Sequence, residues 1–126
     1  MDKKRPVNLD LGTIALPITS YVSILHRVSG VIMFFAVAVL LWLLESSLAS
    51  EASFNELSDL FNNPLCQIIV WGTLAALAYH SVAGMRHMIM DFGVGEDSFY
   101  AGRLSAWAAL ALAALVIALI TLWVFL

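Results

Sequence analysis

The chain has 126 residues, of which 62% are hydrophobic and only 12% are charged. So few charges cannot cover the surface of a soluble domain of this length, and the composition therefore excludes an ordinary water-soluble protein. The net charge of −3 is small, and the placement of the charges along the chain is more informative than their sum.

Three long apolar segments are predicted to cross a membrane, at residues 21–44, 64–90 and 104–126. Each is long enough, because a span through about 30 Å of hydrocarbon needs about 20 residues. Backbone polar groups in lipid must find partners within the segment, so these runs should be helices. The fold class that we predict is all-α, a membrane bundle of three transmembrane helices.

The segments between the spans are polar: an N-terminal segment at 1–20, a loop at 45–63 and a short loop at 91–103. All the basic residues lie in or beside the first and the last of these segments: Lys3, Lys4, Arg5, Arg27, Arg86 and Arg103. With three spans, both segments are on one side of the membrane, which the positive-inside rule makes cytoplasmic. The loop at 45–63 and the C-terminus are then periplasmic.

The first span carries polar side chains near its cytoplasmic end. Ser23, His26, Arg27 and Gly30 share one side of its first turns. A guanidinium at membrane depth needs an anionic or carbonyl partner, such as a haem propionate or a quinone oxygen. Ser23, one turn before Arg27, could donate to the same small molecule. The alternative is that Arg27 extends to the headgroups and only marks the topology.

The second span places His80 in a row of small residues, Gly72, Ala76 and Gly84. A neutral imidazole is a good haem ligand, and small residues leave a shallow wall for a flat macrocycle. The alternative is a histidine that only bridges two helices. His87 is about 10 Å further along the axis, which is too far for it to bind the same iron as His80. The structural explanation for His87 is an interfacial side chain that extends to the headgroups.

His26 is predicted to lie near the membrane surface and His80 deeper, so the two should not meet at one iron. If haem is bound through two histidines, the second must come from another chain. This inference favours a heterodimeric anchor.

Two motifs carry a family resemblance. The first is Arg5-Pro6-Val7, then Leu11, Ile18, Ser23, His26-Arg27 and Ser29. The second runs from His80 through Gly84, Arg86 and His87 to Met90-Asp91-Phe92-Gly93. With three spans and this length, the chain resembles the cytochrome b556 subunits of bacterial succinate dehydrogenase, from Arg5 to the third helix.

The resemblance implies a complex in which a flavoprotein oxidises succinate, an iron–sulfur subunit passes the electrons on, and ubiquinone is reduced in the membrane. This chain would be half of a heterodimeric haem b anchor, with the haem shared between two small anchor subunits. The site residues implied are His80 as axial haem ligand, Ser23 and Arg27 for the quinone, and His26 and Arg27 for the haem propionates. Gly84 and His87 would belong to the haem environment, and Arg86 and Asp91 are candidates for docking the other subunits.

The resemblance also implies a place in the bacterial inner membrane, and a trimer of heterotetramers is one assembly that it allows. This chain has no flavin or iron–sulfur motif, so it should not oxidise succinate alone, and no catalytic residue is assigned to it. Two other functional hypotheses stay open: the anchor of a quinol:fumarate reductase, and a non-redox structural membrane subunit. A proton-conducting transporter is disfavoured because no acidic residue lies in mid-span.

Overall fold

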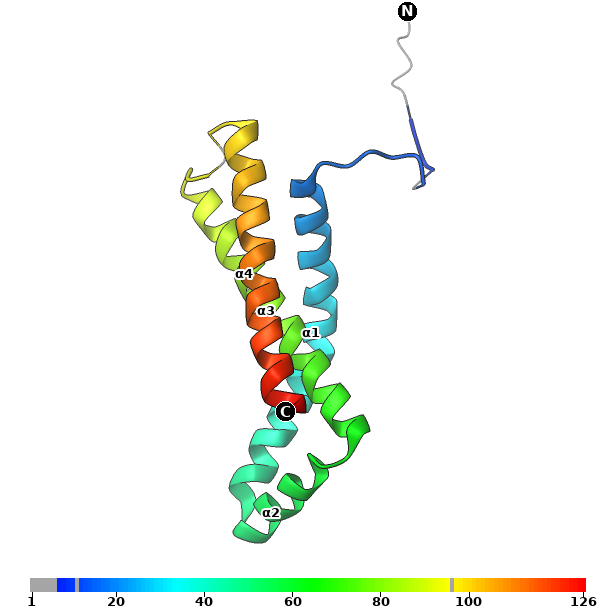
Figure 1. Cartoon of the computed structure of the whole chain (residues 1–126), viewed down its shortest axis with the longest axis vertical. Coiled ribbons are helices and arrows are strands. Elements are labelled where there is room, and N and C mark those ends of the chain that lie inside the picture. The colour runs from blue at the N-terminus through cyan, green and yellow to red at the C-terminus, as the bar shows by residue number, and fades with distance from the viewer. Residues whose placement is uncertain (1–6, 11, 96) are drawn as a thin grey trace, which may run out of the picture.

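The computed structural model describes residues 7–10, 12–95 and 97–126, and these residues fold into four helices (Figure 1). They are α1 (Ile18–Ala49), α2 (Glu51–Leu60), α3 (Pro64–Asp91) and α4 (Phe99–Phe125). Within the described residues, α1, α3 and α4 are long and apolar enough to cross a membrane. The predicted fold class, an all-α bundle of three transmembrane helices, is therefore confirmed. Arg5, Pro6 and Leu11 of the first motif, and Lys3 and Lys4, lie outside the described residues.

Local sequence signals set where the helices start. α1 follows Pro17, whose fixed φ and missing N–H suit a residue just outside a helix. Ser50, Asn63 and Ser98 precede α2, α3 and α4, and the side chain of each accepts a hydrogen bond from a backbone N–H of the first turn. α3 also begins with a proline, Pro64, at a position where no N–H is needed.

The helix α1 is longer than the predicted span. Its 32 residues extend about 48 Å at 1.5 Å per residue, beyond the hydrocarbon thickness. The segment predicted as a polar loop at 45–63 contains the end of α1 and all of α2, which lies beside it (Figure 1). The hydroxyl of Ser53 on α2 donates to the carbonyl of Ser46 on α1 at 2.7 Å, and Leu57 is buried between them. This end of the molecule is a helical hairpin.

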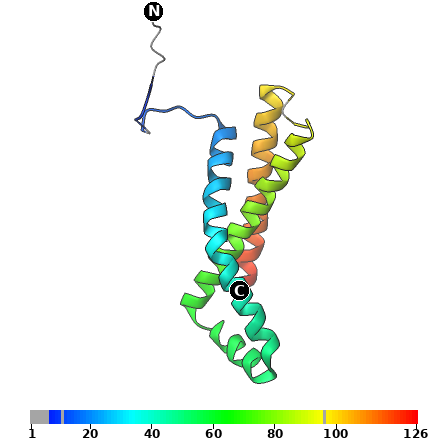
Figure 2. The ribbon, with the colours of Figure 1, turned by 180° about the vertical axis from the view of Figure 1, so that it is seen from behind.

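The three long helices lie side by side, with α3 packed against both α1 and α4 (Figures 1 and 2). The most deeply buried residues of the described part of the chain are Val22, Ala83 and Ala106, one from each helix, and they pack together. Two alanines at this contact let the backbones approach closely. The Tyr79 hydroxyl donates to the Val22 carbonyl at 2.9 Å and adds a polar tie between α3 and α1.

The remaining apolar surface faces outward. Phe34 on α1 is 77% exposed and Trp123 on α4 is 76% exposed. Exposed apolar side chains all around a thin bundle are expected where lipid or partner helices cover it. We call the end at which α1 begins and α3 turns into α4 the basic end, because Arg27, Arg86 and Arg103 lie toward it.

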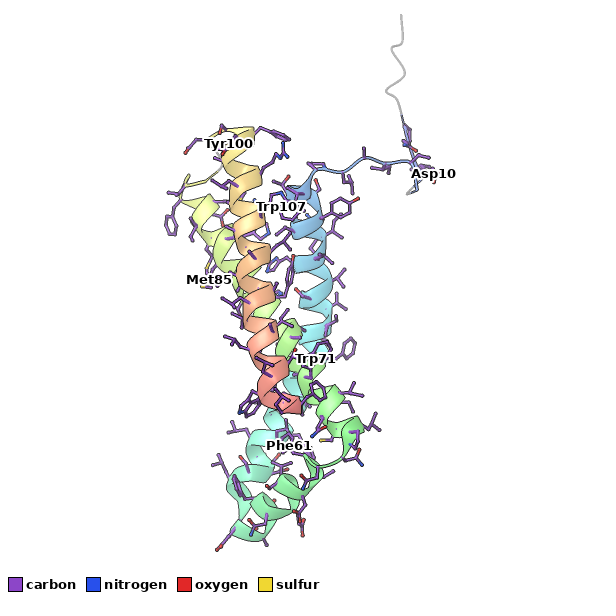
Figure 3. The ribbon with its side chains drawn as sticks, in the orientation of Figure 1. Asp10, Phe61, Trp71, Met85, Tyr100 and Trp107 are labelled. Atoms are coloured by element: carbon purple, nitrogen blue, oxygen red, sulfur yellow. The ribbon has the colours of Figure 1, made fainter. Side chains whose placement is uncertain are left out.

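The turn at the basic end depends on two glycines. Gly93 and Gly95 have φ angles of +78° and +87°, a region that L side chains rarely adopt. Figure 3 shows Tyr100 and Trp107 toward this end of the bundle, with Phe61 and Trp71 toward the α2 end. Two tryptophans toward opposite ends of the bundle match the interfacial positions that this residue prefers in membranes.

Candidate functional site

Three imidazoles form a contiguous stack between α1 and α3. The rings of His26 and His80 are stacked with 4.3 Å between centroids and 17° between planes. His87 lies on the same stack, with its ring 5.0 Å from that of His26 and tilted by 43°. One histidine of α1 therefore lies between two histidines that are two turns apart on α3.

The stack shows that the predicted difference in depth between His26 and His80 is wrong. α1 begins at Ile18 and α3 ends at Asp91, at the same end of the bundle. His26 therefore lies about 12 Å along α1 from that end, and His80 lies about 16.5 Å along α3 from it. The predicted separation came from starting the first helix three residues too late. Stacked rings with nearly parallel planes still cannot ligate one iron from opposite sides, because each ring nitrogen directs its lone pair within its own plane.

Two glycines leave room for the imidazoles. A Cβ atom added at Gly30 would lie 3.2 Å from Cε1 of His80, and one at Gly84 would lie 3.3 Å from Nε2 of His26. Both separations are tighter than ordinary van der Waals contact. Gly84, predicted as part of a wall beside His80, thus contacts His26, while Gly30 of α1 lies against His80.

A hydrogen-bond network fixes one edge of His80. Its Nδ1 lies 3.0 Å from the hydroxyl oxygen of Ser29 and 3.3 Å from the carbonyl oxygen of His26. The Ser29 hydroxyl donates to that same carbonyl at 2.7 Å. Among the described residues, no hydrogen bond engages the other ring nitrogen of His80, Nε2. α1 therefore binds one nitrogen of His80 and leaves the other available.

The neighbouring ring, His26, has a buried nitrogen without a partner. Within the described residues, its Nε2 is the buried side-chain nitrogen or oxygen that lacks a hydrogen bond. An unsatisfied buried polar atom costs about 1–3 kcal/mol, so such an atom calls for an explanation.

A cavity of about 420 Å³ with several polar side chains in its wall opens beside the stack at the basic end, between the first turns of α1 and the last turns of α3. Ser23, Arg27 and His87 line it together with Arg86. The structure therefore brings the two predicted quinone-site residues to one cavity, and it adds a histidine and a second arginine to them. Thr19 and Ser20 also line it. Both could have been predicted from the sequence, because they lie one helical turn before Ser23 on the same side of the same helix.

The arginine in the wall of this cavity, Arg86, is inside the chain. It is 6% exposed, and its guanidinium donates from Nε to the Ser105 hydroxyl at 3.1 Å and from a terminal nitrogen to the Gly102 carbonyl at 3.2 Å. Both acceptors belong to α4, so Arg86 ties α3 to α4 at the basic end. The other docking candidate, Asp91, is exposed at the last residue of α3 and lies outside the cavity.

Apolar helices with imidazoles and guanidinium groups gathered at one end define a small integral membrane subunit with a polar site between its helices. Comparisons with known proteins agree. A family profile described as succinate dehydrogenase/fumarate reductase transmembrane subunit matches residues 1–121. The chain belongs to this family, and it is a membrane subunit of an enzyme complex.

Several relatives named succinate dehydrogenase cytochrome b556 subunit match nearly end to end. The one from Coxiella burnetii is 38% identical over 98% of this chain and 99% of its own length. Those from Rickettsia felis and Paracoccus denitrificans are 36% and 31% identical, each over 96% of this chain and 92% of its own length. The resemblance identified from the two motifs is confirmed.

Proposed function

We propose that this chain holds one haem b through His80 and contributes Ser23 and Arg27 to a ubiquinone-reduction site, as the cytochrome b556 subunit of a succinate dehydrogenase. The observation that carries the proposal is the arrangement around His80. One of its nitrogens is engaged by α1, the other has no partner among the described residues, and the cavity with Ser23 and Arg27 lies two turns away.

The residues present fit a haem. A neutral imidazole is a common axial ligand, and Gly30 leaves the edge of His80 uncrowded. The exposed guanidinium of Arg27 could pair with a haem propionate. His26, the residue before Arg27, would contribute to the same propionate environment once its buried Nε2 is uncovered. When bound, haem supplies one-electron redox chemistry. The protein's contribution is ligation by His80, burial and the pairing of the propionates.

The stacked arrangement of His26 and His80 leaves one ligand from this chain for a given iron. We therefore propose that a second haem ligand would come from a second small anchor subunit and that the haem would be held between the two subunits. The outward-facing apolar surface supports a partner helix bundle, because a thin bundle buries little of itself.

At the cavity, Ser23 and Arg27 would donate hydrogen bonds to a quinone oxygen. Such donors orient the ring and stabilise the negative charge that develops on that oxygen as the quinone is reduced. His87 lines the same cavity from α3, so its imidazole would lie near a quinone head bound there. We accordingly place His87 between the haem environment and the quinone site.

The electrons would come from an iron–sulfur subunit, supplied in turn by a flavoprotein that oxidises succinate. We propose that these subunits dock on the basic end, where Asp91 is exposed, and that this end is cytoplasmic. The segments 1–20 and 91–103 then face the cytoplasm, and 45–63 and the C-terminus face the periplasm of a bacterial inner membrane. The family description covers fumarate reductases as well, and the relatives' names favour succinate dehydrogenase.

The test is to replace Arg27 by leucine in the assembled complex and to measure two activities. Quinone reduction should fall by roughly one to two orders of magnitude, since a donor to developing charge is lost. Succinate oxidation coupled to a dye, which needs only the soluble subunits, should be unchanged. The control is Arg103→Leu, which removes an arginine that lies beside the Phe99 ring and outside the cavity. Equal losses in both activities, or equal effects of both variants, would contradict the proposal.

A further inference from the structure

Ser29 lies in the interface between α1 and α3, in contact with both His26 and His80. It is 5% exposed, lies one turn after His26 on α1, and faces His80 of α3 across the interface. Its hydroxyl oxygen is 2.7 Å from the His26 carbonyl oxygen and 3.0 Å from Nδ1 of His80. It is therefore a link between the backbone of one helix and the imidazole of the other.

The protons in this link can be assigned. A serine hydroxyl has a single proton to donate, and the His26 carbonyl can only accept. The 2.7 Å contact is the shorter of the two, so the hydroxyl proton goes to the carbonyl, and Ser29 presents a lone pair to Nδ1 of His80. The second neighbour of Nδ1 is the same carbonyl oxygen, at 3.3 Å. Because both neighbours of Nδ1 are acceptors, Nδ1 must carry a proton.

A proton on Nδ1 determines what Nε2 can do. A neutral imidazole has one N–H, so with Nδ1 protonated the lone pair of Nε2 is free to bind a metal. Histidines that ligate metals usually donate their other N–H to an oxygen acceptor, which fixes the ring and makes the ligand more basic. From this geometry we infer that Ser29 is a positioning residue that sets the orientation and the tautomer of His80 for iron binding. The inference rests on the proposed role of His80 as haem ligand.

A purely structural role for Ser29 is the competing explanation, and the chain offers a matched case. Ser47, further along α1, donates to the carbonyl of Leu44 at 2.8 Å, the same contact three residues back that Ser29 makes. No histidine is bonded to the hydroxyl of Ser47 among the described residues. An effect on the helix alone should thus appear equally in Ser29→Ala and Ser47→Ala, while an effect on the haem should appear only in Ser29→Ala.

The experiment uses the assembled complex with Ser29→Ala, Ser29→Cys, Ser47→Ala and His80→Leu. Two properties are measured: the rate at which haem transfers to excess apomyoglobin, and the midpoint potential of the haem. Ser29→Ala should keep the haem, because the His26 carbonyl remains as a longer acceptor, but release it roughly tenfold faster. Its potential should rise, because a less basic ligand stabilises ferric iron less. Cysteine is a weaker acceptor of similar size, so Ser29→Cys should have a haem release rate and a midpoint potential between those of Ser29→Ala and the parent. Ser29→Cys takes the place of Ser29→Ala if the Ser29→Ala complex does not assemble.

The outcomes separate the two proposals. Haem release and potential that match the parent in both Ser29 variants, together with loss of haem in His80→Leu, overturn the role of Ser29 and leave the haem ligand in place. A parent-like spectrum in His80→Leu overturns the ligand itself. Equal changes in Ser29→Ala and Ser47→Ala overturn the positioning role in favour of a helix effect.

Discussion

The imidazole of His26 on α1 stacks on the imidazole of His80 on α3, with 4.3 Å between the ring centroids. This contact is possible because Gly30 and Gly84 lie where larger side chains would displace the rings. It places a buried, unpartnered nitrogen of one ring beside a ring whose own second nitrogen is available. Small changes in packing at Gly30 or Gly84 should therefore disturb the stack.

Gly30→Ala should disturb His80. The new Cβ would lie 3.2 Å from Cε1 of the ring, so the imidazole has to shift by a few tenths of an ångström, and overpacking of this kind costs about 1–3 kcal/mol. We expect the haem to be released several-fold faster than in the parent. The release rate is measured from the change in the visible spectrum. The control is Gly72→Ala on α3, where nothing lies within 4 Å of the added Cβ and the gain in helix propensity should stabilise the chain by up to about 1 kcal/mol. The same release rate in both variants would contradict the packing at His80.

Ser23→Ala should weaken quinone binding. Loss of one neutral hydrogen bond is worth about 1 kcal/mol, which corresponds to a roughly fivefold higher KM for the quinone. Ser23→Thr, which keeps the hydroxyl, should restore most of the affinity, and the haem spectrum should be that of the parent in both. A quinone KM that Ser23→Ala leaves unaltered would remove Ser23 from the site.

Arg86→Met should loosen the basic end. The substitution removes two hydrogen bonds from a charged donor to α4, each worth about 1.5–3 kcal/mol, and replaces them by apolar contacts that recover part of the loss. We expect a lower midpoint temperature of unfolding and faster amide exchange at Gly102 and Ser105. Arg86→Lys should not rescue it, because a single ammonium cannot copy the planar guanidinium that reaches both acceptors. The control is Arg103→Met, which removes another arginine at the same end. If Arg86→Met is as stable as the parent, the hydrogen bonds from Arg86 to α4 do not stabilise the basic end.

Membrane orientation can be tested with single cysteines in a Cys66→Ala background. Ser58 on α2 and Asp97 before α4 are both exposed and lie at opposite ends of the bundle. In intact spheroplasts an impermeant maleimide should label Ser58→Cys, and it should label Asp97→Cys only after lysis. The reversed pattern would place the basic end in the periplasm and contradict docking of an iron–sulfur subunit there.

The helices that cross the membrane could be predicted from sequence because apolar length alone decides them. The membership of Ser23 and Arg27 in one site could also be predicted, since four residues on one helix make one turn. The hairpin at the α2 end could not be predicted. Its ten residues of mixed polarity are too short a segment for hydrophobic periodicity to distinguish a helix from a loop.

The contacts between helices were the least predictable part. Whether His26 meets His80 depends on where each helix starts, and an error of three residues shifts a side chain by about 4.5 Å. The internal position of Arg86 was also missed, because a sequence shows a charge near a helix end but not the acceptors on the next helix.

The most direct test of the account is the reduced-minus-oxidised visible spectrum of the purified complex carrying His80→Leu, compared with the parent at equal subunit content. If His80 provides an axial ligand, the parent should show b-type haem bands, and these bands should be lost or strongly shifted in the variant. Identical bands in the two complexes, or no haem bands in the parent, would contradict it.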